Sequence, residues 1–181
     1  MKPSHHLLAL AAAATLALPA QAITFTGTTV GGPVWNRPLF DFSNVSGLGT
    51  AVPYKVTPFS VTASGSYVFQ NTALLPAGWD NYSFVYQNAF NPATPLVNGV
   101  IGNDDNPSIG LSGFTTALSA GTSYFYVVTG FANTDFGTYS ASITGPGNVV
   151  LVPEPTSYGL MGLGLAALLL GTRRRRETAA A

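Results

Sequence analysis

A short polar turn, Asn103-Asp104-Asp105-Asn106, holds the side chains of this sequence that are best suited to binding chemistry. Carboxylate and amide oxygens are hard donors, and calcium takes roughly six to eight of them at a time. Asp80 supplies one more carboxylate from a second loop. Asp80, Asn103, Asp104 and Asp105 are therefore candidate ligands of a calcium site. The spacing is not that of an EF-hand, and the favoured interpretation is that the Asn and Asp residues make the turn by bonding to their own backbone.

The rest of the chain excludes most catalytic chemistry. Both histidines, His5 and His6, lie near the N-terminus, and there is no cysteine. Once a signal peptide is removed, no Ser-His-Asp triad, cysteine nucleophile or usual zinc site is left. A glycosidase needs two carboxylates roughly 5 to 10 Å apart, which leaves an aspartate-only hydrolase using Asp104 and Asp105 as the catalytic alternative. We predict a non-enzymatic protein with no cofactor other than calcium.

Composition narrows the class of protein further. Of the 181 residues only 8% are charged, and Lys+Arg 7 balance Asp+Glu 7. About a quarter of a typical domain is charged, so this value argues against a cytosolic housekeeping enzyme and a coiled coil. No basic stripe crosses the middle of the chain, which argues against binding to nucleic acid. The length favours one domain of ordinary size.

Apolar residues alternate with polar ones along several short stretches, which is the pattern of half-buried strands. Clusters rich in Gly, Ser, Asn and Pro separate these stretches, and no long helical stripe interrupts them. Many short strands with turns between them indicate a sandwich or jelly roll. We therefore predict one all-β domain, a single β-sandwich of jelly-roll type, over residues 23–152. The clearest strands are expected at 59–63, 82–87, 124–129 and 139–144.

Aromatic side chains allow two interpretations. Trp35, Tyr54, Trp79 and Tyr82 have rings that stack on sugars, which suits a protein placed among glycans. Alternation with a period of two favours the core for most of them. Trp79 is flanked by turn residues and is the best candidate for an exposed ring. Glycan binding is therefore kept as an alternative function, beside calcium binding.

Residues 1–22 have the three-part layout of a secretory signal peptide. Lys2 precedes an apolar run over 7–18, and the small-residue triplet Ala20-Gln21-Ala22 follows a proline. Cleavage is expected between Ala22 and Ile23. The apolar run is shorter than the roughly 20 residues that span a bilayer, so a retained anchor is the weaker interpretation. Export through the Sec system is therefore predicted.

Residues 153–181 have the layout of a membrane tail. The turn around Pro153-Glu154-Pro155 precedes an apolar stretch over 158–171 and four arginines, Arg173, Arg174, Arg175 and Arg176. The 156–172 segment is about 25 Å long as a helix, which is near the lower limit for a transmembrane span. Arginine clusters stay on the cytoplasmic side, so the block acts as a cytoplasmic stop.

This tail resembles the PEP-CTERM protein-sorting tails of Gram-negative bacteria. The resemblance implies Pro153, Glu154 and Pro155 as the recognition motif for an exosortase, a membrane-embedded processing enzyme. It also implies transient anchoring in the inner membrane, followed by passage to the cell surface or the extracellular matrix, with exopolysaccharide as an expected partner. The residues Glu177 to Ala181 after the arginines depart slightly from the family pattern. A plain C-terminal anchor, with Pro-Glu-Pro as a linker, is the alternative.

The order of motifs over residues 56–145 is similar to that of bacterial pre-peptidase C-terminal domains. The motifs are Ser64-Gly65-Ser66-Tyr67, Trp79-Asp80-Asn81-Tyr82, Gly102-Asn103-Asp104-Asp105 and Ser119-Ala120-Gly121. This resemblance implies a small, non-catalytic β-sandwich that serves as an accessory module of secreted proteins. Residues 23–53 fall outside it, and we expect them to add an edge strand or a flexible lead.

Overall fold

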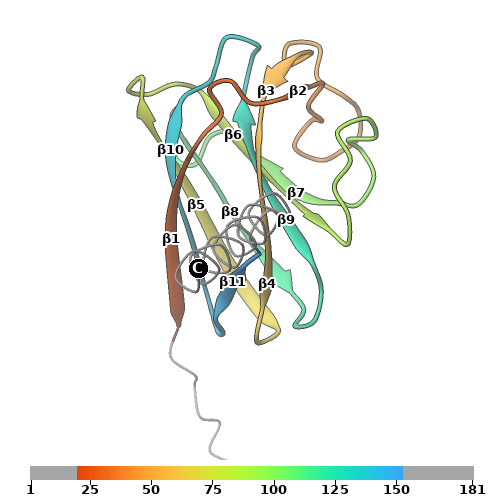
Figure 1. Ribbon diagram of the computed structural model, residues 1–181, viewed down its shortest axis with the longest axis vertical. Helices are drawn as coiled ribbons and strands as arrows, with labels where there is room; N and C mark the ends of the chain where they lie inside the picture. Colours follow the sequence, from red (N-terminus) through yellow and green to blue (C-terminus); the bar gives the residue numbers. More distant parts are fainter. Residues whose placement is uncertain (1–19, 153–181) are drawn as a thin grey trace, which may run out of the picture.

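A computed structural model describes residues 20–152 of the chain, and residues 1–19 and 153–181 lie outside the description. Within the described range every regular element is a strand, and none of it forms a helix that could cross a membrane. The predicted all-β sandwich is confirmed: two antiparallel sheets face each other (Figure 1). The predicted transmembrane helix lies outside the described residues.

The first sheet has four strands in the order β1-β10-β5-β8. The second has five, in the order β11-β4-β9-β6-β7, and a short ribbon pairs β2 with β3. The strands are β1 (Gln21–Thr28), β2 (Val34–Trp35), β3 (Val52–Pro53), β4 (Lys55–Val61), β5 (Gly65–Leu75), β6 (Asn81–Gln87), β7 (Gly99–Asn103), β8 (Leu111–Leu118), β9 (Tyr124–Gly130), β10 (Thr138–Gly145) and β11 (Val149–Leu151). The four strands and the turns expected from the sequence are therefore present.

Inward-facing residues of both sheets form the main core. Alternate residues of β5 and β10 point inward, as the two-residue period of a strand requires. Phe69 of β5 stacks on Tyr126 of β9 across the interior, with ring centroids 5.5 Å apart. Phe59 of β4 stacks in turn on Tyr124 at 5.5 Å. Aromatic rings thus fill much of the space between the two sheets.

The five-stranded sheet is buried on its outer face as well. Residues of β6 are buried from Asn81 through Tyr86 without alternation, so both sides of this strand are covered. Trp35 packs on Phe84 at 5.8 Å and on Phe90 at 5.5 Å, forming a second aromatic layer. The cover comes from the chain between β1 and β4 and from the loop after β6. We call this second layer the outer core; its buried members are Trp35, Val52, Tyr54, Tyr82, Phe84, Tyr86 and Val127.

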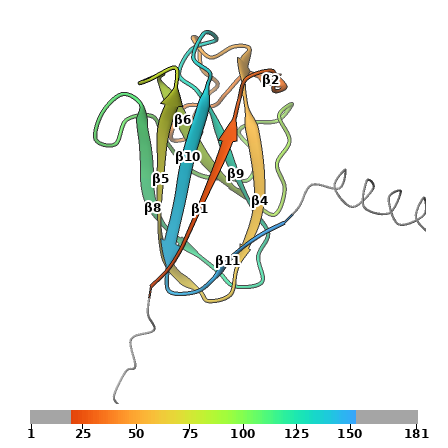
Figure 2. The same ribbon diagram turned by 60° about the vertical axis from the view of Figure 1, so that its left-hand side comes forward.

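Residues 23–53 have two roles. The predicted edge strand is confirmed, since β1 pairs with β10 from Gln21 to Thr28 and forms one edge of the four-stranded sheet. The remaining part is not a flexible lead, because it packs over the outer face of the other sheet. The sequence did not reveal this, since Trp35 and Val52 lie in no alternating run. Figure 2 shows β1 and β10 on the face turned toward the viewer.

Two glycines of β7 leave room for the outer core. A Cβ atom on Gly99 would collide with the ring of Phe42, and one on Gly102 would collide with the ring of Phe84. Both rings therefore rest directly on the backbone of this edge strand. The close approach explains why β7 carries glycine although glycine weakens a strand interior.

Phe84→Ala tests whether the outer core is packed well enough to contribute to the free energy of unfolding as a protein core does. Phe84 is 0% exposed, and we expect its truncation to cost about 3–5 kcal/mol of unfolding free energy, as in a well-packed core. Val68→Ala, at a position that is 50% exposed on the other sheet, should change the value by less than about 0.5 kcal/mol. Urea unfolding followed by tryptophan fluorescence measures both. A loss of under about 1 kcal/mol in Phe84→Ala would mean that the cover is loosely packed.

Candidate functional site

Four aspartates from three separate loops gather at one end of the sandwich. Asp80 lies between β5 and β6, Asp104 and Asp105 lie between β7 and β8, and Asp135 lies between β9 and β10. The charges of Asp105, Asp135 and Asp104 each raise the pKa of Asp80, so the four carboxyl groups share one electrostatic environment. We call these residues the acidic loop end. It lies at the top of Figure 1, whereas β1 begins at the bottom.

Arg37 is the cation that faces this end from inside the protein. Its side chain is 2% exposed. Its Nε and Nη2 atoms donate to the carbonyl of Phe131 at 3.0 and 2.8 Å, and Nη1 donates to the carbonyl of Pro38 at 3.0 Å. The guanidinium lies 4.3 Å from the ring centroid of Tyr82, at cation–π distance. Arg37 thus fastens the outer cover to β6 and to the loop after β9.

The electrostatic balance at Arg37 follows from these surroundings. Burial lowers its pKa, while Tyr82 and the carboxyl groups of Asp104, Asp80 and Asp135 raise it. The guanidinium hydrogen-bonds to carbonyl oxygens, so the aspartates act on it through space. The sequence analysis assigned no role to Arg37. Its position within an aromatic segment, between Trp35 and Phe40, could have indicated that it is buried.

Asp80 has the least satisfied carboxylate of the acidic loop end. Its Oδ1 atom is buried and has no hydrogen-bond partner. Burial first, and then the neighbouring Asp105, Asp135 and Asp104, raise its pKa from 3.8 to about 6, against a smaller opposite effect of Arg37. Such a group holds a proton at mildly acidic pH or accepts a cation from outside.

The 103–106 turn bonds both to its own backbone and to β8. Asp104 Oδ1 accepts the Asp105 N–H at 2.9 Å, which is a contact within the turn. Asn103 Oδ1 accepts the Gly113 N–H at 3.1 Å, and Asn106 Nδ2 donates to the Gly113 carbonyl at 3.0 Å, so both amides bind the strand that follows. The Asp104 contact is of the turn-forming kind considered for the sequence. In residues 20–152 no three acidic side chains converge closely enough to hold a metal ion.

Of the residues predicted for calcium, all four therefore belong to the same end of the fold, but they do not form a compact ligand set. Asn103 is the last residue of β7, next to the loop of Asp104 and Asp105, and Asp80 reaches the same region from the loop between β5 and β6. Calcium binding stays a prediction.

Trp79 does not offer its face to a glycan. It is 6% exposed and belongs to the inner core, and its indole Nε1 donates to the carbonyl of Thr138 at 2.9 Å. The expectation of an exposed Trp79 is therefore wrong, because the indole packs into the inner core at the end of the sandwich. Trp35, Tyr54 and Tyr82 are buried in the outer core, as favoured from the sequence.

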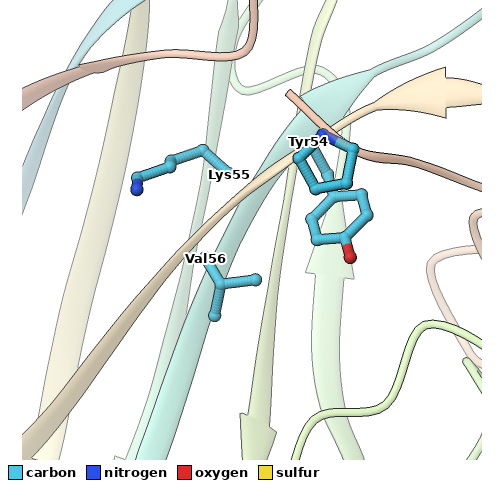
Figure 3. Close-up of a pocket in the computed structure, with 4 residues that line it drawn as sticks. Tyr54, Lys55 and Val56 are labelled. Atoms are coloured by element: carbon cyan, nitrogen blue, oxygen red, sulfur yellow. The ribbon is translucent and has the colours of Figure 1, made fainter. Parts of the chain in front are cut away.

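A shallow pocket of about 270 Å³ lies beside β4, lined by Pro33, Tyr54, Lys55 and Val56 (Figure 3). Pro33 and Tyr54 are joined by a backbone hydrogen bond of 3.0 Å from the Tyr54 N–H to the Pro33 carbonyl. The Lys55 side chain points away from the ring of Tyr54. The lining offers no carboxylate, so the pocket lacks the acid and base pair of a hydrolase.

The residues predicted for processing lie at or beyond the edges of the described range. Pro153, Glu154, Pro155 and the arginines at 173–176 lie outside it. Ala20 and Ala22 are exposed, and Ile23 is half-buried against the inner core. The expected cleavage point thus falls within β1, at its first residues.

Asp80→Asn tests how much the ionised Asp80 carboxylate destabilises the folded state at the acidic loop end. The folded pKa of about 6 lies above the ordinary 3.8, so the folded state binds the proton more tightly and loses stability as pH rises from about 4 to 6. We expect Asp80→Asn to gain about 1 kcal/mol at pH 7.5, roughly 3 °C in Tm, after allowance for solvent screening. The gain should vanish near pH 4, as thermal unfolding across this range would measure.

Asp41→Asn is the matched control. Hydrogen bonds from Ser43 lower the pKa of Asp41, so its ionised form is favoured by folding and its replacement should give no gain at pH 7.5. An equal rise of Tm in both variants would reflect net charge alone and contradict the special environment of Asp80.

Comparison with known proteins identifies the tail. Residues 151–176 match the PEP-CTERM protein-sorting motif, in agreement with the family resemblance of the sequence. No curated protein matches the chain.

Three solved structures show distant similarity to the domain. The pre-peptidase C-terminal domain of a collagenase from Bacillus anthracis is 16% identical with a TM-score of 0.43, over 67% of this chain and 87% of that one. The K3 cleaved adhesin domain of Lys-gingipain from Porphyromonas gingivalis is 17% identical with a TM-score of 0.35, over 70% and 91%. PliG from Aeromonas hydrophila, a periplasmic inhibitor of g-type lysozyme, is 10% identical with a TM-score of 0.36, over 75% and 88%.

A pre-peptidase C-terminal domain is thus among the similar structures, although at this level of likeness no ligand or activity passes from them to this chain. The match of known function is the tail: directly after a β-sandwich, the chain carries a PEP-CTERM protein-sorting motif.

Proposed function

We propose that this chain is an exported, non-catalytic protein of the cell surface or extracellular matrix, processed through its tail by an exosortase-type enzyme. The observation that carries the proposal is the sorting motif at residues 151–176. Export through the Sec system, transient residence in the inner membrane and association with exopolysaccharide belong to the same proposal.

The junction between the domain and the tail supports processing without unfolding. The last strand, β11, pairs with β4 through Val149, Val150 and Leu151, and the Val152 N–H donates to the Pro58 carbonyl at 2.8 Å. These bonds all lie before Pro153. A cut between Pro153 and Ser157 therefore leaves the pairing of β11 with β4 intact.

At the N-terminal junction, signal cleavage would remove the first two paired residues of β1, Gln21 and Ala22, but none of the residues that pack against the inner core. Ile23 and Phe25 pack against the inner core, and Phe25 meets the Tyr126 ring edge-on at 6.2 Å. Gln21 and Ala22 are exposed. Cleavage between Ala22 and Ile23 would remove two exposed residues of β1 and keep those that pack.

Glu154→Ala tests sorting directly. In the native host we expect the wild-type protein outside the inner membrane to have the mass of a chain from Ile23 to a residue between Pro153 and Ser157. Glu154→Ala should accumulate in the membrane fraction with Arg173–Arg176 still attached, because the recognition motif is lost. Intact mass spectrometry of membrane and extracellular fractions measures both forms.

Glu177→Ala is the matched control, since it removes a carboxylate from the same tail but outside the matched segment. It should be processed like the wild type. A wild-type mass that retains Arg173–Arg176 in every fraction would refute the proposal and leave a membrane-anchored β-domain.

A second candidate function is calcium binding at the acidic loop end. It is favoured by the buried, unpartnered Oδ1 of Asp80 within reach of three other carboxyl charges. A cation there would offset the repulsion that raises the pKa of Asp80. The side chain of Asp104 would have to rearrange to join it, because its Oδ1 atom accepts the Asp105 N–H within the turn.

Calcium binding predicts a rise in Tm. Calcium at about 100 times its Kd adds roughly 2.7 kcal/mol to a folded state that alone binds it. We expect this shift in the wild type and its loss in both Asp80→Asn and Asp104→Asn, with Asp41→Asn retaining it, in calorimetry of the full chain. No shift, or an equal shift with magnesium, would exclude a specific calcium site.

A further inference from the structure

A layer of polar side chains crosses the apolar interior of the sandwich. Asn71 of β5 and Ser112 of β8 are directly paired across the four-stranded sheet, and both are 0% exposed. Asn81 and Ser83 of β6 reach the layer from the facing sheet and are equally buried. The Oγ atoms of Ser83 and Ser112 lie 2.9 Å apart, in hydrogen-bond contact. The layer therefore joins the two sheets.

Several polar atoms of this layer have no protein partner. Neither the Nδ2 nor the Oδ1 atom of Asn71 makes a hydrogen bond, and by hydrogen-bond geometry the same is true of Asn81 Oδ1 and the Tyr126 hydroxyl. Burial raises the pKa of Tyr126, against a smaller opposite effect of the nearby Ser83 hydroxyl, so the phenol keeps its proton. Buried polar groups in folded proteins almost always have a partner. An asparagine amide that can donate twice and accept twice is the strongest exception in the described part of this chain.

Most neighbours of Asn71 on its face of the sheet have small side chains. Its paired neighbours are Ala141 and Ser112, and Ala73 follows it on the same face, whereas the larger Phe69 precedes it. A water molecule requires two to four polar partners and only a small volume, and Asn71, Asn81 and Tyr126 together offer both donors and acceptors.

We propose that this layer is a binding site for ordered water, which bridges Asn71 of one sheet to Asn81 and Tyr126 of the other. The unpartnered groups are neutral, which favours a neutral ligand over a cation.

The bound water also supports the acidic loop end. Asn81 Nδ2 donates to the carbonyl of Gly110 at 2.9 Å, in the loop that links β7 to β8. Water that accepts from or donates to the remaining atoms of Asn81 and Asn71 fixes the amide in this orientation. The interior site thus acts as a positioning element for the loop that carries Asp104 and Asp105, independently of sorting.

Oxygen-17 relaxation dispersion of water tests the site, because it counts water molecules that are retained inside a protein. We use the full chain purified in detergent, as wild type and as Asn71→Leu, Thr72→Leu and Tyr126→Phe. The wild type should show long-lived internal water, and Asn71→Leu should lose at least one such molecule. Thr72→Leu changes the other face of the same strand and should lose none.

Tyr126→Phe keeps the ring and removes only the hydroxyl, so it remains informative if Asn71→Leu does not fold. We expect it to reduce the number of retained water molecules or to shorten their residence. The proposal is overturned if the wild type retains no internal water, or if folded Asn71→Leu and Tyr126→Phe both match the wild type. A stoichiometric metal ion found by elemental analysis, and kept after dialysis against a chelator, would likewise overturn it in favour of an ion site.

Discussion

The structure depends on one constraint: central strands of the five-stranded sheet carry apolar side chains on the outer face as well as the inner face. In β9, Tyr126 points into the sandwich while Val127 points out of it, and in β6 the rings of Tyr82 and Phe84 also point out of it. A sandwich normally leaves its outer faces to water, and this one would then expose a row of aromatic rings. The chain meets the constraint by folding the segment between β1 and β4 over the outer face. Without that cover, the two-layer fold would expose a large apolar patch to solvent.

The cover explains the placement of the charged residues. A segment packed on an apolar sheet has few positions for cations, and Arg37 is tolerated because three of its nitrogen atoms find carbonyl oxygens and its plane lies on Tyr82. A buried guanidinium attracts carboxylates, and the loops nearest to it carry Asp80, Asp104 and Asp135. The acidic loop end is therefore connected to the outer core through Arg37. Asp80 remains the poorly satisfied member, since its own buried oxygen has no partner.

The sequence predicted the elements whose pattern is local and missed those that depend on the partner surface. Alternation located the cores of β4, β6, β9 and β10, because each has one regularly spaced apolar face. It could not show that Tyr82, Phe84 and Tyr86 face a second layer, since a strand covered on both faces needs no alternation at all. Trp79 was misjudged for a related reason: its flanking turn residues suggested exposure, while the indole packs inward and donates to Thr138. The sorting motif was identifiable from sequence because it is a linear pattern, matched at residues 151–176.

The acidic residues illustrate the limit of composition as a guide to sites. Two adjacent aspartates between two asparagines have the oxygen donors that calcium binds. The same residue types also form turns by hydrogen bonding to the backbone, and this use requires no cation. Deciding between these uses requires the positions of Asn103 Oδ1 and Asp104 Oδ1, and both accept backbone N–H groups here. The groups left without partners are elsewhere, at Asp80 and inside the sandwich at Asn71. Unsatisfied buried atoms, rather than clusters of suitable residue types, are thus the basis on which binding by this domain is proposed.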